Sequence, residues 1–256
     1  IASTWFGYIS SHVPAAVQVV SGRRPGRQEA RAAHVCGIVG LFLKDKALEP
    51  ELGRLTAAML HEMCGRGPDS AGFAVYGTGT GGASKICAVK RLATLDWQDV
   101  TARLARATGS KVTCETIEDH AVLRIEGDGA KARTWLIENV PEATVLSEGE
   151  AIEIYKGVGD PDAISARLRL ASFSGTHAIG HTRMATESAV TIAGSHPFST
   201  GRDTCLVHNG SLSNHNRLRE TLRRHGERFQ TENDTEVASG YLSVGCMPCS
   251  SRTAPD

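Results

Sequence analysis

Several features that would point to a membrane protein or a nucleic-acid-binding protein are missing from this sequence. No stretch approaches the roughly 20 consecutive apolar residues that a membrane-spanning helix needs. Lysine plus arginine and aspartate plus glutamate are equal at 28 each, which leaves a formal net charge of zero. This balance gives no electrostatic reason to expect nucleic acid or an anionic membrane as a partner.

A disulfide framework is also missing. The seven cysteines are an odd number without a framework spacing, and a chain of 256 residues can bury a core without cross-links. Reduced thiols and a cytoplasmic location are therefore expected. Cys246 and Cys249 form one C-x-x-C pair near the chain end, without the strand–helix context of a redox motif. A redox pair or half of a metal site there is the less favoured interpretation.

The first 35 residues differ in composition from the rest. They contain four arginines, several serines and a single acidic residue, Glu29, with no sustained apolar period. A transit peptide has this composition, a removable propeptide is a second interpretation, and a misplaced start with translation beginning at Val35 is a third. We favour the third, because a GTG start codon reads as valine, and keep the propeptide as its rival. Residues 1–35 are predicted to form a disordered extension.

From Cys36 the pattern becomes that of a folded domain. The apolar run 36–42 (CGIVGLF) predicts a buried strand. Residues 51–64 carry leucines and methionines at helical spacing after a proline, which predicts a helix. Residues 70–76 and 85–90 are predicted to be the two strands of a hairpin.

The segment between these two strands, GTGTGG at 77–82, formally matches the G-x-G-x-x-G pattern. A dinucleotide-binding fingerprint must open a helix. The residues that follow this segment (ICAVKRL) instead have the pattern of a strand. We therefore interpret 77–82 as a flexible hairpin loop.

Residues 97–170 alternate helix-like and strand-like segments and carry no catalytic motif. Helices are predicted near 100–107, 130–139 and 161–170, and strands near 111–116, 121–126, 143–147 and 151–156. This pattern is typical of an α/β unit inserted into a larger domain, 36–240, where it docks a partner or covers the site. The tail 241–256 lacks periodicity and is predicted to be irregular.

Five sequence motifs need a common explanation. They are CGIVG at 36–40, RGPDSAG at 66–72, HTRMAT at 181–186, HNG at 208–210 and NDTE at 233–236. Together they resemble the class II glutamine amidotransferases, which include asparagine synthetase, amidophosphoribosyltransferase and glutamate synthase. The resemblance covers residues 36–240. The long insertion before HTRMAT is most similar to stand-alone amidotransferase subunits related to glutamate synthase and N-methylglutamate synthase.

The resemblance assigns the nucleophile to Cys36. Hydrolysis of an unactivated amide needs a strong nucleophile, and cysteine is the most nucleophilic side chain at neutral pH. A nucleophile that is the first residue can use its own α-amine, which titrates at about 8, as the base. The alternative role for Cys36 is that of a small buried core residue.

The resemblance also assigns the groups that contact substrate. The Asn209 amide and the Gly210 N–H match an oxyanion hole, although Asn-Gly is also a common hairpin turn. Arg183 suits the α-carboxylate of glutamine because its planar fork pairs with two oxygens, and Thr186 could add a hydrogen bond there. Asp234 suits the α-ammonium group. The alternatives are a structural ion pair for Arg183 and a helix N-cap for Asp234.

Other polar residues in these motifs are interpreted as structural. Arg66 and Asp69 are expected in a loop packed behind the nucleophile strand. His181, His196 and His208 do not follow zinc-ligand spacing. We therefore interpret them as loop or core histidines rather than metal ligands.

The resemblance implies an α+β fold, a four-layer αββα Ntn-hydrolase sandwich with an α/β insertion, truncated at its C-terminus. The implied reaction converts L-glutamine and water into L-glutamate and ammonia through a thioester on Cys36. No metal or organic cofactor is required. Because no acceptor-binding domain is visible, the resemblance implies a glutamate-synthase-like partner subunit that accepts the ammonia.

Two rival interpretations remain open. One is an Ntn amidase that acts on another amide, although Arg183 and Asp234 together favour a free α-amino acid. The other is a non-catalytic subunit that docks and regulates a synthase. With 35 residues ahead of it, Cys36 lacks the free amine, so this chain is expected to be inactive until trimmed or correctly initiated.

Overall fold

The computed structural model describes the backbone of residues 5–10 and residues 36–79, 81–184 and 190–245 in full. Within these ranges the chain forms ten strands and six α-helices. The strands are β1 (Trp5–Ser10), β2 (Gly37–Phe42), β3 (Ser70–Tyr76), β4 (Ser84–Lys90), β5 (Val112–Ile117), β6 (His120–Ile125), β7 (Ala143–Gly149), β8 (Ile152–Val158), β9 (His177–Arg183) and β10 (Thr204–Asn209). The helices are α1 (Leu52–His61), α2 (Trp97–Thr108), α3 (Gly129–Asn139), α4 (Pro161–Arg167), α5 (His215–Arg224) and α6 (Asp234–Gly245), with short 3-10 helices η1 (Lys46–Glu51) and η2 (Leu170–Ser172).

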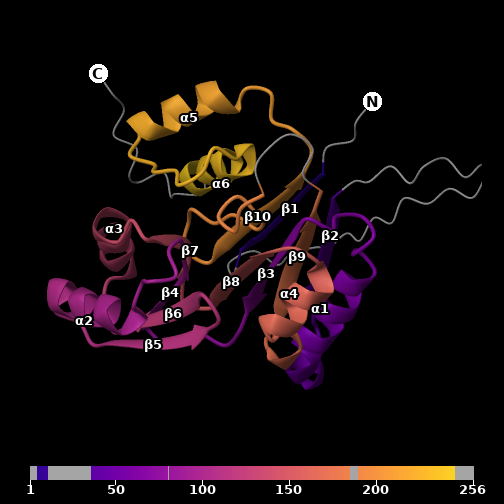
Figure 1. Cartoon of the computed structure of the whole chain (residues 1–256), viewed down its shortest axis with the longest axis horizontal. Helices are drawn as coiled ribbons and strands as arrows, with labels where there is room; N and C mark the ends of the chain where they lie inside the picture. The colour runs from indigo at the N-terminus through magenta and orange to yellow at the C-terminus, as the bar shows by residue number, and fades with distance from the viewer. Residues whose placement is uncertain (1–4, 11–35, 80, 185–189, 246–256) are drawn as a thin grey trace, which may run out of the picture.

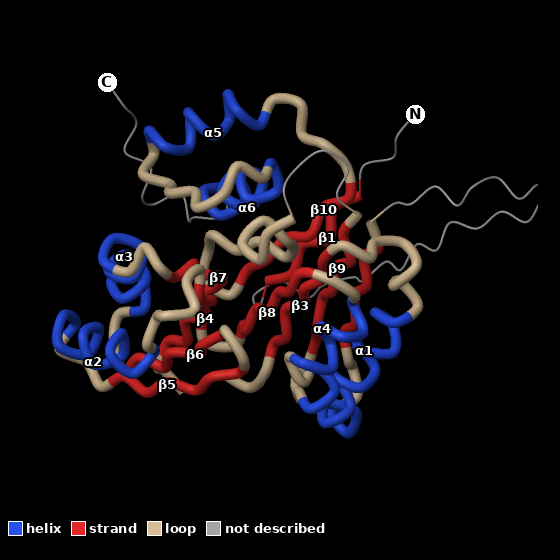
Figure 2. The backbone as a smooth tube through the Cα atoms, in the orientation of Figure 1, coloured by secondary structure: helices blue, strands red, loops and turns tan. Residues whose placement is uncertain are grey.

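The strands form two four-stranded antiparallel sheets and one antiparallel pair. The first sheet has the order β2-β9-β3-β8, the second has the order β5-β6-β4-β7, and β1 pairs with β10. Figures 1 and 2 show the two larger sheets side by side, with α1 and α4 beside the first and α2 and α3 beside the second. Helix α6 packs on β10, and α5 packs on α6 (Figure 1).

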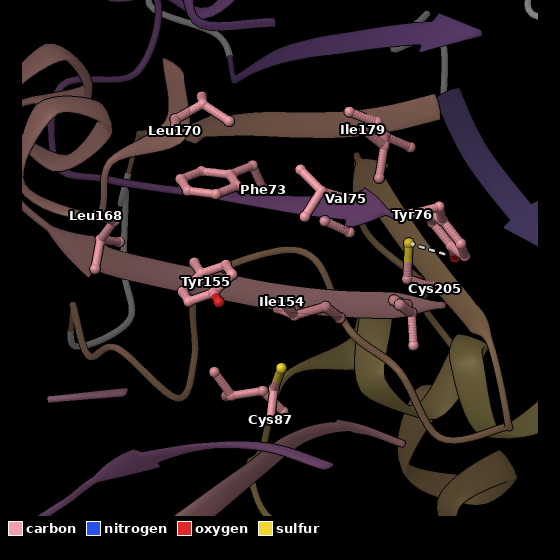
Figure 3. Packing of buried hydrophobic residues seen from close by; sticks show 14 of the residues in the cluster. Phe73, Val75, Tyr76, Cys87, Ile154, Tyr155, Leu168, Leu170, Ile179 and Cys205 are labelled. Atoms are coloured by element: carbon pink, nitrogen blue, oxygen red, sulfur yellow. Dashed lines mark hydrogen bonds between the residues drawn. The ribbon is translucent and has the colours of Figure 1, made fainter. Parts of the chain in front are cut away.

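Strand β4 shows how the layers are stacked, because its two faces contact different neighbours. Successive side chains of a strand point to opposite faces. Ile86 and Ala88 pack in a cluster with residues of α2 and α3, whereas Cys87 and Val89 pack in the cluster that includes the first sheet. In Figure 3, Cys87 faces Ile154 of β8. The strand is apolar on both faces because helices cover one face and the first sheet covers the other.

Helices α1 and α4 cover the outer face of the first sheet. Leu52 and Leu60 of α1 are fully buried, at a spacing that places both on one face of the helix. Helix α4 begins with Pro161, and the Asp160 carboxylate accepts a hydrogen bond from the Ala163 N–H at 3.0 Å. Both start signals are typical of helices, so this layer follows directly from local sequence.

The predicted hairpin of 70–76 and 85–90 is wrong, although both strands exist as β3 and β4. Strand β3 pairs with β8 and β9, and β4 pairs with β6 and β7. The glycine-rich segment between them passes from one sheet to the other and leads into a strand, as its sequence predicts. Both strands are buried on both faces, and such a pattern does not identify the neighbours that pair with them.

The second sheet and helices α2 and α3 form a unit of residues 84–149, which we call the inserted unit. The predicted insertion, 97–170, omits β4 and includes β8 and α4, which belong to the first sheet layer. Strands β4 and β8 have similar apolar patterns. Their sequences therefore do not reveal which sheet each one joins.

The two terminal segments also differ from the sequence-based expectation. Residues 1–35 were expected to lack regular structure, yet β1 pairs antiparallel with the whole of β10. The predicted irregular tail 241–256 begins inside α6, which continues to Gly245. The other residues of the two segments lie outside the described ranges.

The observed elements confirm the predicted α+β class, with antiparallel sheets packed together and flanked by helices. The longest helices, α2 and α6, have 12 residues each. In the part of the chain that the structure describes, no helix combines the length and apolar character needed to cross a bilayer.

Candidate active site

Cys36 lies at the start of β2, beside the end of β9. Strand β2 is one of the two edge strands of the first sheet, and its Gly37 lies opposite Thr182 of β9. The Cys36 side chain is partly exposed, and its thiol donates toward the carbonyl oxygen of Met184 at 3.9 Å. The predicted nucleophile therefore occupies an accessible strand end next to the HTRMAT motif.

The peptide that follows Cys36 is held by a fully buried threonine. The Thr182 hydroxyl accepts a hydrogen bond from the Gly37 N–H at 3.2 Å and donates one to the Met63 carbonyl at 3.1 Å. A Cβ atom on Gly37 would lie 2.7 Å from Thr182 Oγ1 and 2.8 Å from Met63 Cβ. Glycine is therefore required after Cys36 for β2 to approach β9 and α1 this closely.

The RGPDSAG motif packs against the end of β9. A Cβ atom on Gly67 would lie 2.6 Å from the carbonyl carbon of Thr182, and the Asp69 N–H donates to the Arg183 carbonyl at 3.1 Å. The motif therefore fixes the backbone on which Arg183 is mounted. This placement agrees with the architectural role expected for the motif.

Asn209 is the last residue of β10 and contacts Cys36, the predicted nucleophile. Its Nδ2 donates a hydrogen bond to the Cys36 carbonyl oxygen at 3.1 Å. Gly210 follows directly. Residues that are 173 positions apart in sequence therefore meet at one point, at the ends of β2 and β10.

Arg183 and Asp234 line one cavity of about 830 Å³. Arg183 ends β9 and Asp234 begins α6. The other residues that line the cavity are Val89, Lys90, Arg91, Thr144, Thr191, Ile192, Ala193, Gly194, Ser211, His215, Gln230, Thr231, Glu232 and Asn233. The structure thus brings together the two residues that sequence analysis assigns to the two charged ends of glutamine.

A loop carbonyl holds the Arg183 guanidinium group in this cavity. Arg183 is 8% exposed, and its Nη1 donates to the Gly194 carbonyl oxygen at 3.3 Å. The side-chain amide of Asn233 donates to the same oxygen at 3.2 Å. The Gly194 carbonyl therefore anchors the arginine and also links it to the residue that precedes α6.

Asn233, rather than Asp234, caps helix α6. Its Oδ1 accepts a hydrogen bond from the Thr235 N–H at 2.9 Å. The N-cap alternative for Asp234 is therefore wrong by one residue. The Asp234 carboxylate instead accepts hydrogen bonds from the Leu212 N–H at 2.7 Å and from the Thr235 hydroxyl at 3.3 Å. Sequence analysis missed Asn233, although an Asn before Asp-Thr-Glu is itself an N-cap signal.

The inserted unit forms one wall of the cavity. Residues 89–91, at the end of β4, and Thr144 of β7 belong to the lining. The side chain of Gln230 binds the backbone of Val145 twice, accepting from its N–H at 3.0 Å and donating to its carbonyl at 2.8 Å. The unit therefore contributes directly to the site and is tied to the loop ahead of α6.

The three motif histidines, His181, His196 and His208, are buried. The rings of His181 and His196 stack at 4.1 Å between centroids. Burial lowers the pKa of His181 to about 3 and that of His196 well below its usual value of 6.5. Burial also lowers the pKa of His208. Neutral, packed imidazoles agree with the interpretation of these residues as core histidines.

A different cluster meets the geometric requirements for a metal ion. Among the described residues it consists of His61, Cys64 and Asp162, whose ligand atoms lie within 4.8 Å of one another. His61 and Asp162 are exposed and already hydrogen-bonded to each other at 2.7 Å. No motif histidine belongs to this cluster, and its two helices are too far apart in sequence for a spacing pattern to reveal it.

Two predictions fall on residues outside the described ranges. Thr186, expected beside the substrate carboxylate, lies in the segment 185–189. Cys246 and Cys249 lie in 246–256. The structural roles of these three residues stay predictions.

Comparison with known proteins identifies the family. The family profile of the glutamine amidotransferase domain matches residues 170–250. The chain is 51% identical over 211 residues to the glutamine amidotransferase-like protein GlxB of Rhizobium meliloti, covering 82% of this chain and 70% of that protein. It is 36% identical over 221 residues to a putative glutamine amidotransferase of Methanothermobacter thermautotrophicus, covering 82% of this chain and 72% of that protein.

A shorter similarity covers a small part of a much longer relative. The chain is 40% identical over 90 residues to a glutamine–fructose-6-phosphate aminotransferase of Bradyrhizobium diazoefficiens, covering 35% of this chain and 15% of that protein. The two longer matches extend over most of this chain and most of each relative. The chain that holds Cys36, Asn209, Arg183 and Asp234 in this arrangement belongs to the glutamine amidotransferase family.

Proposed function

We propose that this chain hydrolyses L-glutamine to L-glutamate and ammonia by the class II mechanism, with Cys36 as nucleophile. The observation that carries the proposal is the hydrogen bond from the Asn209 amide to the Cys36 carbonyl. Arg183, which lines the cavity together with Asp234, directly precedes Met184, whose carbonyl oxygen is 3.9 Å from Cys36 Sγ. A candidate nucleophile, a candidate oxyanion donor and two charged binding groups of opposite sign thus come from four separate segments. Packing of the fold alone does not require these four groups to come together.

Glutamine binds with its two charged ends in the cavity. Arg183 receives the α-carboxylate, because it lines the cavity and its planar guanidinium fork can pair with two carboxylate oxygens. Asp234 receives the α-ammonium. The side-chain amide then points toward Cys36. Thr186 adds a hydrogen bond to the carboxylate end.

The reaction proceeds through a thioester. The α-amine of Cys36 takes the thiol proton, and the sulfur attacks the δ-carbon of glutamine. The Asn209 Nδ2–H and the Gly210 N–H donate to the oxygen of the tetrahedral intermediate. Proton return to the leaving nitrogen releases ammonia. Water, deprotonated by the same amine, then attacks the thioester to give glutamate and restore the thiol.

This mechanism needs a free amine at Cys36. In the chain as given, a peptide bond joins Cys36 to the residue before it, so removal of residues 1–35 or initiation next to Cys36 is part of the proposal. The Ntn-hydrolase form of the αββα fold, the domain range 36–240 and a glutamate-synthase-like subunit that accepts the ammonia also belong to it. The name of the R. meliloti relative supports the amidotransferase function in general terms.

A combined mass and activity measurement tests the proposal. The full chain is expressed in its native host, its intact mass is measured, and glutamate release from glutamine is assayed on the same sample. We expect a chain that begins at Cys36 and releases glutamate, with activity abolished in Cys36→Ala. Cys64→Ala is the matched control, because Cys64 is another partly exposed thiol at the end of α1, and it should keep activity. A chain that begins at Cys36 but releases no glutamate overturns the proposal.

The pairing of β1 with β10 favours a second candidate, a non-catalytic subunit that regulates a synthase. If the extension stays in place as a strand, Cys36 keeps its peptide bond and has no free amine. The same mass measurement decides between the candidates. Retention of residues 1–35 without glutaminase activity supports the regulatory subunit.

A further inference from the structure

The hydroxyl group of Thr235 lies at the centre of a buried cluster that the proposed reaction does not use. Thr235 is the second residue of α6 and is 1% exposed. Its Oγ1 is 2.9 Å from Nε2 of His196, 3.3 Å from Nδ1 of His208 and 3.3 Å from Oδ1 of Asp234. Side chains from three separate segments therefore meet at one hydroxyl group.

The hydrogen-bonding capacity of these groups fixes the direction of each contact. A hydroxyl group donates one proton and accepts at two lone pairs, whereas a carboxylate oxygen only accepts. The Thr235 proton therefore goes to Asp234, and the two imidazoles donate to Thr235. Nδ1 of His196 has no hydrogen-bond partner among the described residues, which agrees with a single proton on Nε2.

These contacts hold the chain on both sides of Asn209 and Gly210. His208, bound to Thr235, comes directly before them. Leu212 comes shortly after them, and its N–H donates to Oδ2 of Asp234 at 2.7 Å. The first two residues of α6 therefore hold the end of β10 and the loop that follows it.

We propose that Thr235 is a positioning residue that fixes Asp234 and the Asn209–Gly210 pair in one geometry. The proposal rests on the proposed function, in which Asp234 binds the α-ammonium and the Asn209–Gly210 pair stabilises the oxyanion. It makes substrate recognition and transition-state stabilisation parts of one hydrogen-bonded unit. Donors aligned before the reaction are more effective than donors that must reorganise during it.

The test compares two substitutions at Thr235 with one elsewhere. Thr235→Val keeps the side-chain shape and removes the hydroxyl group, whereas Thr235→Ser keeps the hydroxyl group. Thr56→Val is the matched control. Thr56 is also 1% exposed and lies in a helix, but its hydroxyl group donates to the Leu52 carbonyl at 2.8 Å, within α1.

Glutamine hydrolysis and thermal unfolding are measured on the chain in the form that its host produces. We expect Thr235→Val to lower kcat by about tenfold to a hundredfold, as small misplacements of catalytic groups do. KM should rise less than kcat falls, and Thr235→Ser should restore most of kcat. Thr56→Val should lower the unfolding temperature without changing kcat. A Thr235→Val variant whose kcat equals that of Thr56→Val overturns the proposal.

A second background tests whether Thr235 acts through Asn209. In Asn209→Ala, the additional substitution Thr235→Val should have little further effect on kcat, because the donor that it positions is gone. Independent, multiplicative losses in the double variant would contradict the proposal.

Nitrogen-15 spectra of the histidines give a readout that does not require glutaminase activity. Near neutral pH, we expect His196 to carry its proton on Nε2 and His208 on Nδ1, and we expect both signals to shift in Thr235→Val. Protonation of either ring on its other nitrogen overturns the proposal. An inactive wild-type chain that shows the expected tautomers would instead count against the proposed function alone.

Discussion

The inserted unit and the segment from β9 to α6 are both built from strands and helices, but the side chains in their cores differ in polarity. The core between the second sheet and helices α2 and α3 is an apolar cluster, and polar residues that the unit also buries, such as Lys85 and His120, make hydrogen bonds to β8 instead. From β9 to α6, the buried residues include histidines, threonines, two arginines and acidic side chains. These polar groups are joined by hydrogen bonds such as those of Thr182, Asn209 and Thr235.

This difference separates two kinds of constraint. Apolar packing depends on volume and tolerates exchanges of similar size. A buried hydrogen-bonded network depends on the position of each donor and acceptor, and an unmatched group inside it is costly. Changes in the inserted unit should therefore alter stability first, and changes between β9 and α6 should alter activity first.

The largest expected effect is on the stability of the inserted unit. Leu136 of α3 is 1% exposed and packs in its apolar cluster. Leu136→Ala removes buried methyl groups and leaves a cavity, so the free energy of unfolding should fall by about 2–5 kcal/mol. Chemical denaturation measures this loss. The KM for glutamine should stay unchanged at temperatures where the variant is folded, and a large rise in KM would break the comparison.

The next effect should appear in activity rather than stability. Arg183→Lys keeps the charge but loses the planar fork that pairs with a carboxylate. We expect kcat/KM for glutamine to fall by about a hundredfold, mainly through KM, with little change in the unfolding temperature. Steady-state kinetics measure the effect.

Arg103→Lys on α2 is the control for Arg183→Lys. Arg103 contacts Asp99 and the Asn139 carbonyl within the inserted unit. Its substitution should leave both KM and kcat unchanged. Equal losses of kcat/KM in Arg183→Lys and Arg103→Lys would show that a general effect on charge or folding, rather than the loss of carboxylate recognition, lowers the activity.

The two regions also differ in how much of them sequence alone predicts. The β3 boundaries are predicted as observed, and the helices α2 and α3 lie within two or three residues of their predicted positions, because local periodicity and caps define them. The pairing of β4 was missed, because partner choice depends on contacts that are distant in sequence. Strand β1 was missed because its pairing partner is a strand about 200 residues away.

Site prediction shows a similar limit. Cys36, Arg183, Asn209 and Asp234 belong to motifs. The structure brings Asn209 into contact with Cys36 and places Arg183 and Asp234 in the lining of one cavity, and the catalytic roles of all four stay predictions. Covering of the site by the insertion was one of two predicted roles, but the residues of β4 and β7 that line the cavity and the hydrogen-bonded role of Thr235 were not predicted. They arise only when several segments meet in space, and no local pattern encodes such a meeting.

Two buried lysines with different surroundings give the comparison with the smallest expected effect. Lys85 of β4 lies 2.8 Å from the Glu153 carboxylate. Lys156 of β8 has no carboxylate within ion-pair distance among the described residues. Its ammonium group lies 3.5 Å from the Ala193 carbonyl and 4.2 Å from the centre of the Phe198 ring. Burial lowers the pKa of Lys156 from 10.5 to about 7.

The lowered pKa of Lys156 predicts a pH-dependent stability. Between about pH 7 and 10.5 the unfolded chain binds more protons at Lys156 than the folded chain does, so this lysine makes stability rise with pH. Within this range, Lys156 raises the free energy of unfolding by at most about 1.4 kcal/mol per pH unit. Below about pH 7 both states are protonated at Lys156, and above about pH 10.5 both are deprotonated, so in those ranges Lys156 does not make stability depend on pH.

Chemical denaturation at several pH values between 7.5 and 9.5 measures this contribution. Lys156→Met should stabilise the chain near neutral pH, because it removes a buried charge without an ion-pair partner. It should also flatten the rise in stability with pH. Lys85→Met should instead destabilise the chain, because it leaves the Glu153 carboxylate, only 14% exposed, without its partner. If both variants respond alike, burial alone rather than pairing decides what a buried lysine contributes, and the distinction between the two lysines fails.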